Sequence, residues 1–141
     1  FYNDPTVLFF STHDQFAYPG TGSPKRKGNG KGLGFNINVH LPCKTKDEQI
    51  IKVFDQILVP KAHKFKPDFI LISAGFDSRI NDTLGCFDLS DGCFRKLTKI
   101  LKNLSKLYCD NRILSILEGG YNLTGNANAT IAHINELNNL N

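Results

Sequence analysis

Short apolar runs alternate with amphipathic segments along the chain. Three runs, Val7–Ser11, Asp68–Ser73 and Ile113–Leu117, are largely continuous, which is typical of strands covered on both faces of a parallel sheet. Phe35–Leu41 instead alternates apolar and polar residues, and this alternation predicts a half-buried or edge strand. The pattern therefore predicts four strands at widely spaced positions.

Three other segments carry apolar residues at helical spacing. The first follows Thr45, which stands three residues before Glu48 as in a capping box, and we expect Pro60 to bend or end this helix. Ser90 is the predicted cap of the second helix, and the third is expected over Ala127–Leu140. Alternating strands and helices predict an α/β fold, with a mostly parallel sheet flanked by helices.

Composition limits the function classes without selecting one. The 141 residues are 40% hydrophobic and 21% charged, which is ordinary for a globular domain, and no apolar run approaches the roughly 20 residues of a membrane span. Much of the net charge of +4 lies in Pro24–Gly32, either a solvated loop or a contact surface for acidic partners. The chain begins at Phe1 and contains no methionine, so we expect residues 1–141 to be a single partial domain.

Two strand ends carry chemically useful side chains. "AGFDSR" follows one buried run and places Asp77 just past it, and "EGGY" follows another and places Tyr121 just past that one. Ligands of open parallel sheets bind beyond the carboxyl ends of the strands. We therefore expect one carboxylate and one phenol to lie at the same edge of the sheet.

Such a pair has a definite use. A carboxylate is a hard oxygen ligand for a divalent cation, and a tyrosine keeps its proton near pH 7 and can donate it in a hydrogen bond. Aimed at the carbonyl of a metal-bound substrate, the phenol would stabilise the oxyanion that forms when water attacks. Spacing alone leaves the alternatives open, because an Asp after a strand is commonly a turn or cap residue.

Three stretches together resemble the zinc-dependent histone deacetylase family, in its class II or bacterial amidohydrolase-like type. They are "STHDQFAYPGTG", "SAGFDSRINDTLGCFDLS" and "LEGGYNL", in this order and spacing. The resemblance extends from Phe1 to about Leu137 and identifies the chain as similar to the C-terminal part of the catalytic domain. It implies an arginase-like α/β fold, a zinc cofactor, bound potassium, and hydrolysis of acetyl-lysine or related acetylamides.

The resemblance also implies site residues, by their position within these motifs. Asp77 would be a zinc ligand, and Tyr121 would be the catalytic residue that polarises the acetyl carbonyl. The implied substrate-binding residues are Tyr18, Leu84 and Gly120. The implied potassium ligands are Ser11 and Thr12 at one site and Phe1, Asp4, Val7 and Phe35 at a second. Relatives usually have proline at the position of Thr83. The threonine of this chain therefore replaces a rigid turn residue, but no ligand is lost.

The family's paired histidines and its Asp-x-His motif have no counterpart in the chain. The four histidines, His13, His40, His63 and His133, are not near a second His or Asp at ligand spacing. Because one carboxylate cannot hold a catalytic zinc alone, we expect residues 1–141 by themselves to be inactive.

Three hypotheses about the function remain. The first is deacetylation of lysine on a histone or another protein, with corepressor-type protein partners. The second is hydrolysis of acetylpolyamines or small acetylamides, and the third is a non-catalytic interaction protein with a deacetylase fold. An arginase-type ureohydrolase is disfavoured, because Ser78 and Arg79 follow Asp77 where a second carboxylate is needed. We expect an intracellular protein, in cytoplasm or nucleus, without membrane association or sequence-specific nucleic-acid binding.

Overall fold

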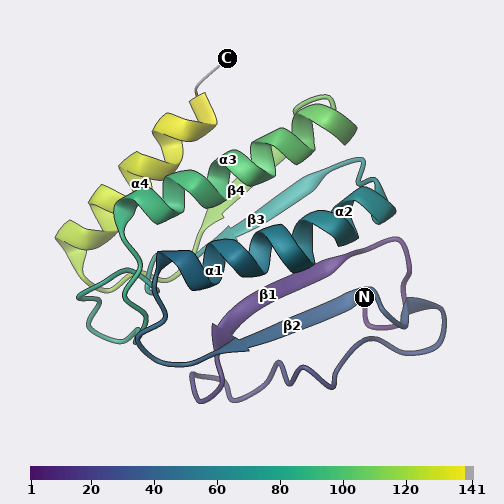
Figure 1. Cartoon of the computed structure of the whole chain (residues 1–141), viewed down its shortest axis with the longest axis horizontal. Helices are drawn as coiled ribbons and strands as arrows, with labels where there is room; N and C mark the ends of the chain where they lie inside the picture. Colours follow the sequence, from purple (N-terminus) through teal and green to yellow (C-terminus); the bar gives the residue numbers. More distant parts are fainter. Residues whose placement is uncertain (139–141) are drawn as a thin grey trace. The chain divides into compact units, whose positions relative to one another are not determined.

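The computed structural model describes residues 1–138, and the chain forms two compact units, Phe1–Cys43 and Lys44–Asn141 (Figure 1). Each unit is described by itself. Both contain a pair of parallel strands, as the alternating pattern predicted. Within residues 1–138, no helix is both long and apolar enough to span a membrane. Whether residues 1–141 form a single partial domain stays a prediction.

The first unit is built on β1 (Phe9–Asp14) and β2 (Asn36–Leu41), which pair in parallel with Phe9 opposite Asn36 and Asp14 opposite Leu41. β2 lies where the alternating pattern placed it. β1 begins two residues later than predicted and extends through polar residues to Asp14, because its register with β2 continues there. A short 3-10 turn (Gly30–Gly32) lies in the connecting loop.

The second unit begins with one continuous helical rod. It comprises α1 (Asp47–Val53), a π-helical segment η2 (Phe54–Leu58) and α2 (Val59–Phe65). The prediction that Pro60 bends or ends the helix is wrong as an end point, because the helix continues to Phe65. Proline has no N–H to donate, and Pro60 stands in the first turn of α2, directly after the π-helical segment.

The predicted capping box at the start of α1 is wrong by one residue. Thr45 is fully buried, and the cap position is Lys46, whose backbone N–H donates to the side-chain oxygen of Gln49 at 2.9 Å. Asp47 and Glu48 occupy the first turn, where the helix dipole favours negative charge. The helix therefore begins later than the Thr45–Glu48 spacing indicates.

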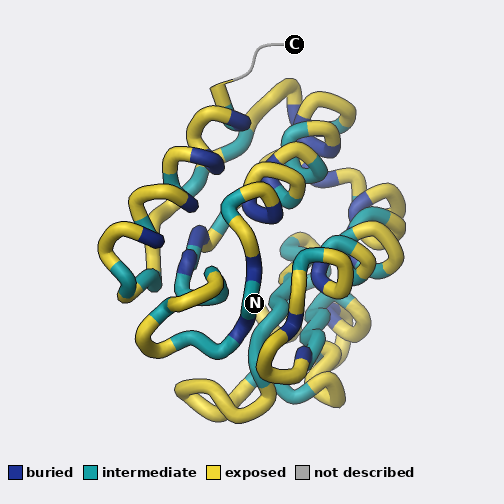
Figure 2. Tube along the Cα trace, turned by 60° about the vertical axis from the view of Figure 1, so that its left-hand side comes forward, coloured by how far each residue is buried: buried dark blue, intermediate teal, exposed yellow. Residues whose placement is uncertain are grey.

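The rest of the second unit alternates strands and helices. β3 (Ile70–Ala74) pairs in parallel with β4 (Ile113–Leu117), with Ile70 opposite Ile113, and these strands lie close to the predicted runs. α3 (Asp91–Tyr108) connects them, and α4 (Leu123–Asn138) follows β4 and lies beside α3 (Figure 1). Figure 2 shows buried positions recurring along the helices. Cys93 on α3 and Ala129 on α4 are fully buried.

Two details of this unit differ from the sequence pattern. α4 begins at Leu123 instead of Ala127, because the Asn122 side chain accepts the backbone N–H of Gly125 at 2.8 Å and so caps the helix. The predicted end of this helix, Leu140, lies outside the described residues. The expected burial of strands on both faces is also not observed, since Leu114 and Ile116 are about half exposed.

His133 joins three elements inside the second unit. Its ring is buried, with Nδ1 2.6 Å from the Thr98 hydroxyl on α3 and Nε2 2.7 Å from the Ser115 hydroxyl on β4. The Thr98 hydroxyl donates to the carbonyl of Phe94 at 2.6 Å, so it accepts from His133. This arrangement requires a proton on Nδ1, and burial lowers the pKa of His133, which favours the neutral ring.

We predict that this histidine makes stability depend on pH. In the unfolded chain its pKa is near 6.5, so below about that pH the unfolded state binds a proton that the folded state does not. The free energy of unfolding should therefore fall as pH falls from about 6.5 toward the lower folded pKa. Urea titrations at several pH values should show a smaller dependence in His133→Gln than in the wild type. An unchanged dependence in His133→Gln would contradict the prediction.

Candidate active site

Asp77 follows β3 on a loop that is fixed by the contacts of the neighbouring Phe76. The strand ends at Ala74, and Phe76 donates its backbone N–H to the carbonyl of Gly119 at 2.7 Å, which ties this loop to the one after β4. The Phe76 side chain is 2% exposed and packs edge-on against Phe94 and His133. Because Phe76 is fixed on both its backbone and its ring, the half-buried Asp77 beside it has little freedom of position.

The structure brings Asp77 and Tyr121 together around Gly119. A Cβ atom added to Gly119 would lie 2.7 Å from a carboxylate oxygen of Asp77 and 3.4 Å from the hydroxyl of Tyr121. Both polar groups therefore converge on the same point past the ends of β3 and β4. Since 2.7 Å is closer than a Cβ atom can approach, only glycine leaves room for the pair.

Gly120 has a separate reason to be glycine. Its φ is +145°, and a Cβ atom there would lie 2.7 Å from the side chain of Asn126. Asn126 also donates its amide hydrogen to the Gly120 carbonyl at 3.1 Å. The Gly119–Gly120 step thus permits a sharp turn that presents the Tyr121 side chain, which is 49% exposed.

The surroundings of Asp77 disfavour the ionised form of its carboxyl group. Burial is the main cause that raises the pKa of Asp77, and the negative charges of Asp82 and Glu118 raise it further. The nearby Arg79 does not relieve this charge, because its guanidinium donates to both carboxylate oxygens of Asp91, at 2.7 and 3.0 Å. A desolvated carboxylate near further negative charge is a setting that a bound cation would stabilise.

The residues implied as substrate-binding lie on exposed loops. Tyr18 is 98% exposed in the first unit, between β1 and β2, and Leu84 is 73% exposed in the second unit, between β3 and α3. The two belong to different units and are described separately. Their roles toward substrate stay predictions.

The residues implied as potassium ligands all lie in the first unit. Ser11 and Thr12 are on β1, and the Ser11 hydroxyl lies 2.9 Å from Nδ1 of His13. The carbonyl of Phe1 accepts from the backbone of Asp4 at 2.9 Å, and that of Phe35 accepts from Phe9 at 2.8 Å. Val7 precedes β1. Potassium binding at either set stays a prediction.

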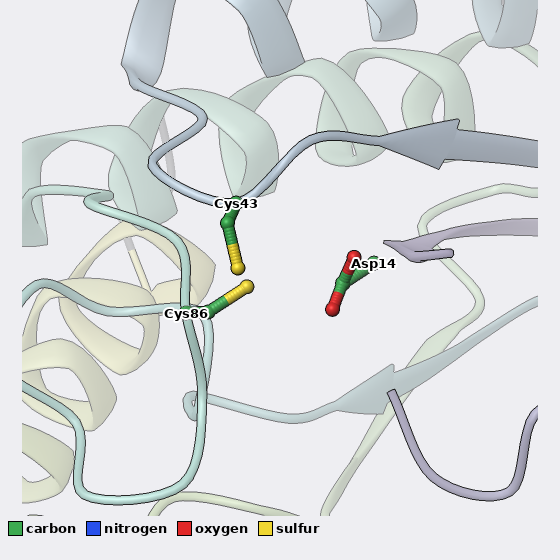
Figure 3. A group of neighbouring side chains, drawn as sticks. All are labelled: Asp14, Cys43 and Cys86. Atoms are coloured by element: carbon green, nitrogen blue, oxygen red, sulfur yellow. The ribbon is translucent and has the colours of Figure 1, made fainter. Parts of the chain in front are cut away.

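A pocket of about 320 Å³ lies past the carboxyl ends of β1 and β2 in the first unit. Asp14 ends β1 and Cys43 follows β2, and a carboxylate oxygen of Asp14 lies within 4.8 Å of the Cys43 sulfur (Figure 3). The lining residues are Asp14, Gln15, Phe16, His40, Leu41, Pro42 and Cys43. Sequence reasoning selected none of them as a site residue.

Sequence reasoning also overlooked Asp82. Its carboxylate accepts the backbone N–H groups of Tyr121 and Asn122, 39 and 40 residues away, at 2.7 and 3.1 Å. The Asp-x-x-Gly spacing of Asp82 and Gly85 does indicate a turn in which the carboxylate binds nearby N–H groups. Nothing in the local pattern indicates the contact with the Tyr121 loop.

Known proteins resemble this chain in sequence and in structure. Residues 1–137 match the family described as "Histone deacetylase domain". A "Probable deacetylase" of Archaeoglobus fulgidus is 42% identical over 125 residues, which cover 89% of this chain and 35% of that protein. "Histone deacetylase 14, chloroplastic" of Arabidopsis thaliana is 43% identical over 123 residues, which cover 87% of this chain and 29% of that protein.

Solved structures agree with the sequence comparison. The HDA15 HD domain superposes with a TM-score of 0.88 at 37% identity, covering 97% of this chain and 38% of that one. The histone deacetylase Clr3 superposes with a TM-score of 0.90 at 34% identity, covering 97% of this chain and 23% of that one. These matches confirm the predicted α/β deacetylase fold, although the chain spans only about a third or less of the length of these relatives. The chain belongs to the histone deacetylase domain family.

Proposed function

We propose that this chain supplies part of the active site of a zinc-dependent deacetylase that hydrolyses acetyl-lysine. One observation carries the proposal: the Asp77 carboxylate and the Tyr121 hydroxyl converge on the same point beside Gly119. A ligand for a cation and a proton donor at one strand edge are two of the groups that metal-assisted amide hydrolysis requires. Membership of the deacetylase family supports assigning that reaction to this edge.

The residues present fit one position of a zinc site. Asp77 is a half-buried carboxylate whose pKa is raised by burial and further by the negative charges of Asp82 and Glu118, and zinc accepts carboxylate oxygen as a ligand. Catalytic zinc sites commonly have three protein ligands, so other segments of the full-length protein would supply the rest. When bound, zinc would contribute Lewis-acid polarisation of the acetyl carbonyl and activation of the attacking water.

Tyr121 would act on the substrate itself. A phenol keeps its proton near pH 7, so it can donate a hydrogen bond to the acetyl oxygen as negative charge develops there. Gly119 lets the Asp77 carboxylate and the Tyr121 hydroxyl approach one point, where the acetyl group would lie. We propose that Gly120 contributes through its positive-φ turn, which directs Tyr121, and that Leu84 contacts the apolar stem of the acetyl-lysine side chain. The substrate contact of Tyr18, in the first unit, stays a prediction.

We also propose the two potassium sites, from the local geometry of their residues. Phe1 and Asp4 share one turn, and Ser11 and Thr12 are neighbours on β1. Carbonyl and hydroxyl oxygens of this kind suit hard cations. Corepressor-type partners and an intracellular location in cytoplasm or nucleus stay predictions.

Substrate class is tested by comparing two acetylated amines. For the full-length protein, we expect kcat/KM to be higher on an acetyl-lysine peptide than on a mono-acetylated diamine of similar length, because a histone or another protein is the proposed substrate. Acetate release reports turnover on both. A preference for the diamine would favour the acetylpolyamine reading, and no turnover of either, with no zinc bound, would favour the non-catalytic interaction protein.

A further inference from the structure

One carboxylate in the second unit binds four backbone N–H groups from two loops. Oδ1 of Asp82 accepts from Leu84 and Gly85, both at 2.9 Å, and Oδ2 accepts from Tyr121 at 2.7 Å and from Asn122 at 3.1 Å. The first pair closes the turn after β3, and the second pair lies in the loop after β4. Asp82 therefore joins these two loops through both of its carboxylate oxygens at the candidate site.

We infer that Asp82 is the positioning residue that holds Tyr121 in its catalytic orientation, an inference that rests on the proposed function. Asp82 acts through the Tyr121 backbone and does not itself contact the reacting atoms. Hydrogen bonds from N–H groups to an ionised carboxylate are shorter and stronger than neutral ones. Two of them, on consecutive residues, fix the direction in which the Tyr121 side chain leaves the loop.

The loop needs such a restraint because of its own sequence. Gly119 and Gly120 precede Tyr121, and glycine allows more backbone conformations than any other residue. About half of the Tyr121 side chain is exposed, so packing alone restrains it weakly. A displacement of about 1 Å in a reacting group can cost a factor of about 100 in rate. Restraint of the backbone at Tyr121 would therefore determine the position of its side chain for catalysis.

Neighbouring contacts hold the loop without replacing Asp82. Asn126 donates to the carbonyl of Gly120 at 3.1 Å, and the Asn122 amide donates to the carbonyl of Asn81 at 2.9 Å. The N–H groups of Tyr121 and Asn122 both bind Asp82, at the amino-terminal end of α4, where a negative charge is favoured by the helix dipole. The loss of Asp82 would leave these two donors without their acceptor.

The same carboxylate also restrains Leu84, the proposed substrate contact. Its Oδ1 binds the Leu84 backbone N–H, while its Oδ2 binds that of Tyr121. A shift of either loop is therefore transmitted to the other through the Asp82 carboxylate. Asp82 would set the position of the proton donor relative to this part of the substrate site.

Amide hydrogen exchange tests the structural half of the inference without requiring activity. In Asp82→Ala, the Tyr121 and Asn122 amides should exchange at least about tenfold faster than in the wild type. The control Asp47→Ala also removes a half-buried carboxylate that accepts a distant backbone N–H, that of Ser90, and it should leave the Tyr121 amide unchanged. Unchanged exchange at Tyr121 in Asp82→Ala would overturn the inference.

A double-mutant cycle in the full-length protein tests the catalytic half. Asp82→Ala should lower kcat by about 100-fold when Tyr121 is present, and by little when Tyr121 is already phenylalanine, because the two changes remove the same function. An equal loss in both backgrounds would show a general structural role and overturn the inference. Asp82→Asn, which keeps the shape and one acceptor oxygen, should give an intermediate kcat and serves if the alanine variant does not fold.

The two arms separate the failure of the inference from that of the proposed function. A full-length wild type without deacetylase activity would refute the proposed function, and with it the catalytic role of Asp82. Faster exchange of Tyr121 and Asn122 would still show that Asp82 orders the loop. An active wild type whose kcat is unaffected by Asp82→Ala would refute the inference and leave the proposed function standing.

Discussion

Replacing Tyr121 with phenylalanine should lower kcat of the full-length protein by about 100- to 1,000-fold, while zinc stays bound. The range is that of removing one hydrogen-bond donor from an oxyanion-stabilising site. Phenylalanine keeps the ring and deletes only the hydroxyl, which lies at the same point beside Gly119 as the Asp77 carboxylate. Steady-state kinetics on an acetyl-lysine peptide, with metal analysis of the same samples, would measure both quantities.

A matched control is available in the same unit. The hydroxyl of Tyr108 bonds to Nδ1 of His63 at 2.7 Å, in a pair that involves none of the site residues. Tyr108→Phe deletes the same group and should leave kcat within about a factor of two, as expected of a surface change. Near-normal turnover in Tyr121→Phe would remove Tyr121 from the proposed catalytic role.

Replacing Asp77 with asparagine should abolish zinc binding and lower kcat/KM by at least about 1,000-fold. The expected size follows from losing the several kcal/mol that a metal contributes to transition-state stabilisation. The same change should raise the midpoint of thermal unfolding of the metal-free protein. The carboxylate is desolvated and lies near Asp82 and Glu118, so its negative charge opposes folding when no cation is present.

Opposite effects on stability and activity distinguish a ligand from a turn residue. If Asp77 were only a cap or turn residue, Asp77→Asn would lower stability or leave it unchanged, and zinc would remain bound. Asp88→Asn is a suitable control, because Asp88 pairs with the exposed Lys44 in the same unit at 3.3 Å. It should change neither zinc content nor turnover.

Hydrophobic pattern was sufficient to predict the strands and the order of the elements. The run Ile113–Leu117 coincides with β4, and Ser90 caps α3 by accepting the backbone N–H of Cys93 at 3.1 Å, as its position predicted. These features depend on neighbours in sequence. The placement of Asp77 and Tyr121 at one edge could be predicted as well, because parallel strands fix which ends meet.

Features that depend on distant or competing partners could not be predicted. The helix cap is Lys46 instead of the predicted Thr45, because Thr45 is buried and its backbone carbonyl accepts the N–H of Asp88 at 2.9 Å. Pro60 lies in the first turn of α2, and the π-helical segment before it continues the helix across this position. The role of Asp82 requires contacts across 39 residues, which no local pattern contains.

The most direct test of the central claim measures zinc content and acetate release on one preparation of the full-length protein. The account predicts one catalytic zinc per chain, turnover of an acetyl-lysine peptide, loss of both on chelation, and recovery of both when zinc is restored. Turnover that persists without zinc, or a protein that neither binds zinc nor releases acetate, would contradict the proposed joint role of Asp77 and Tyr121.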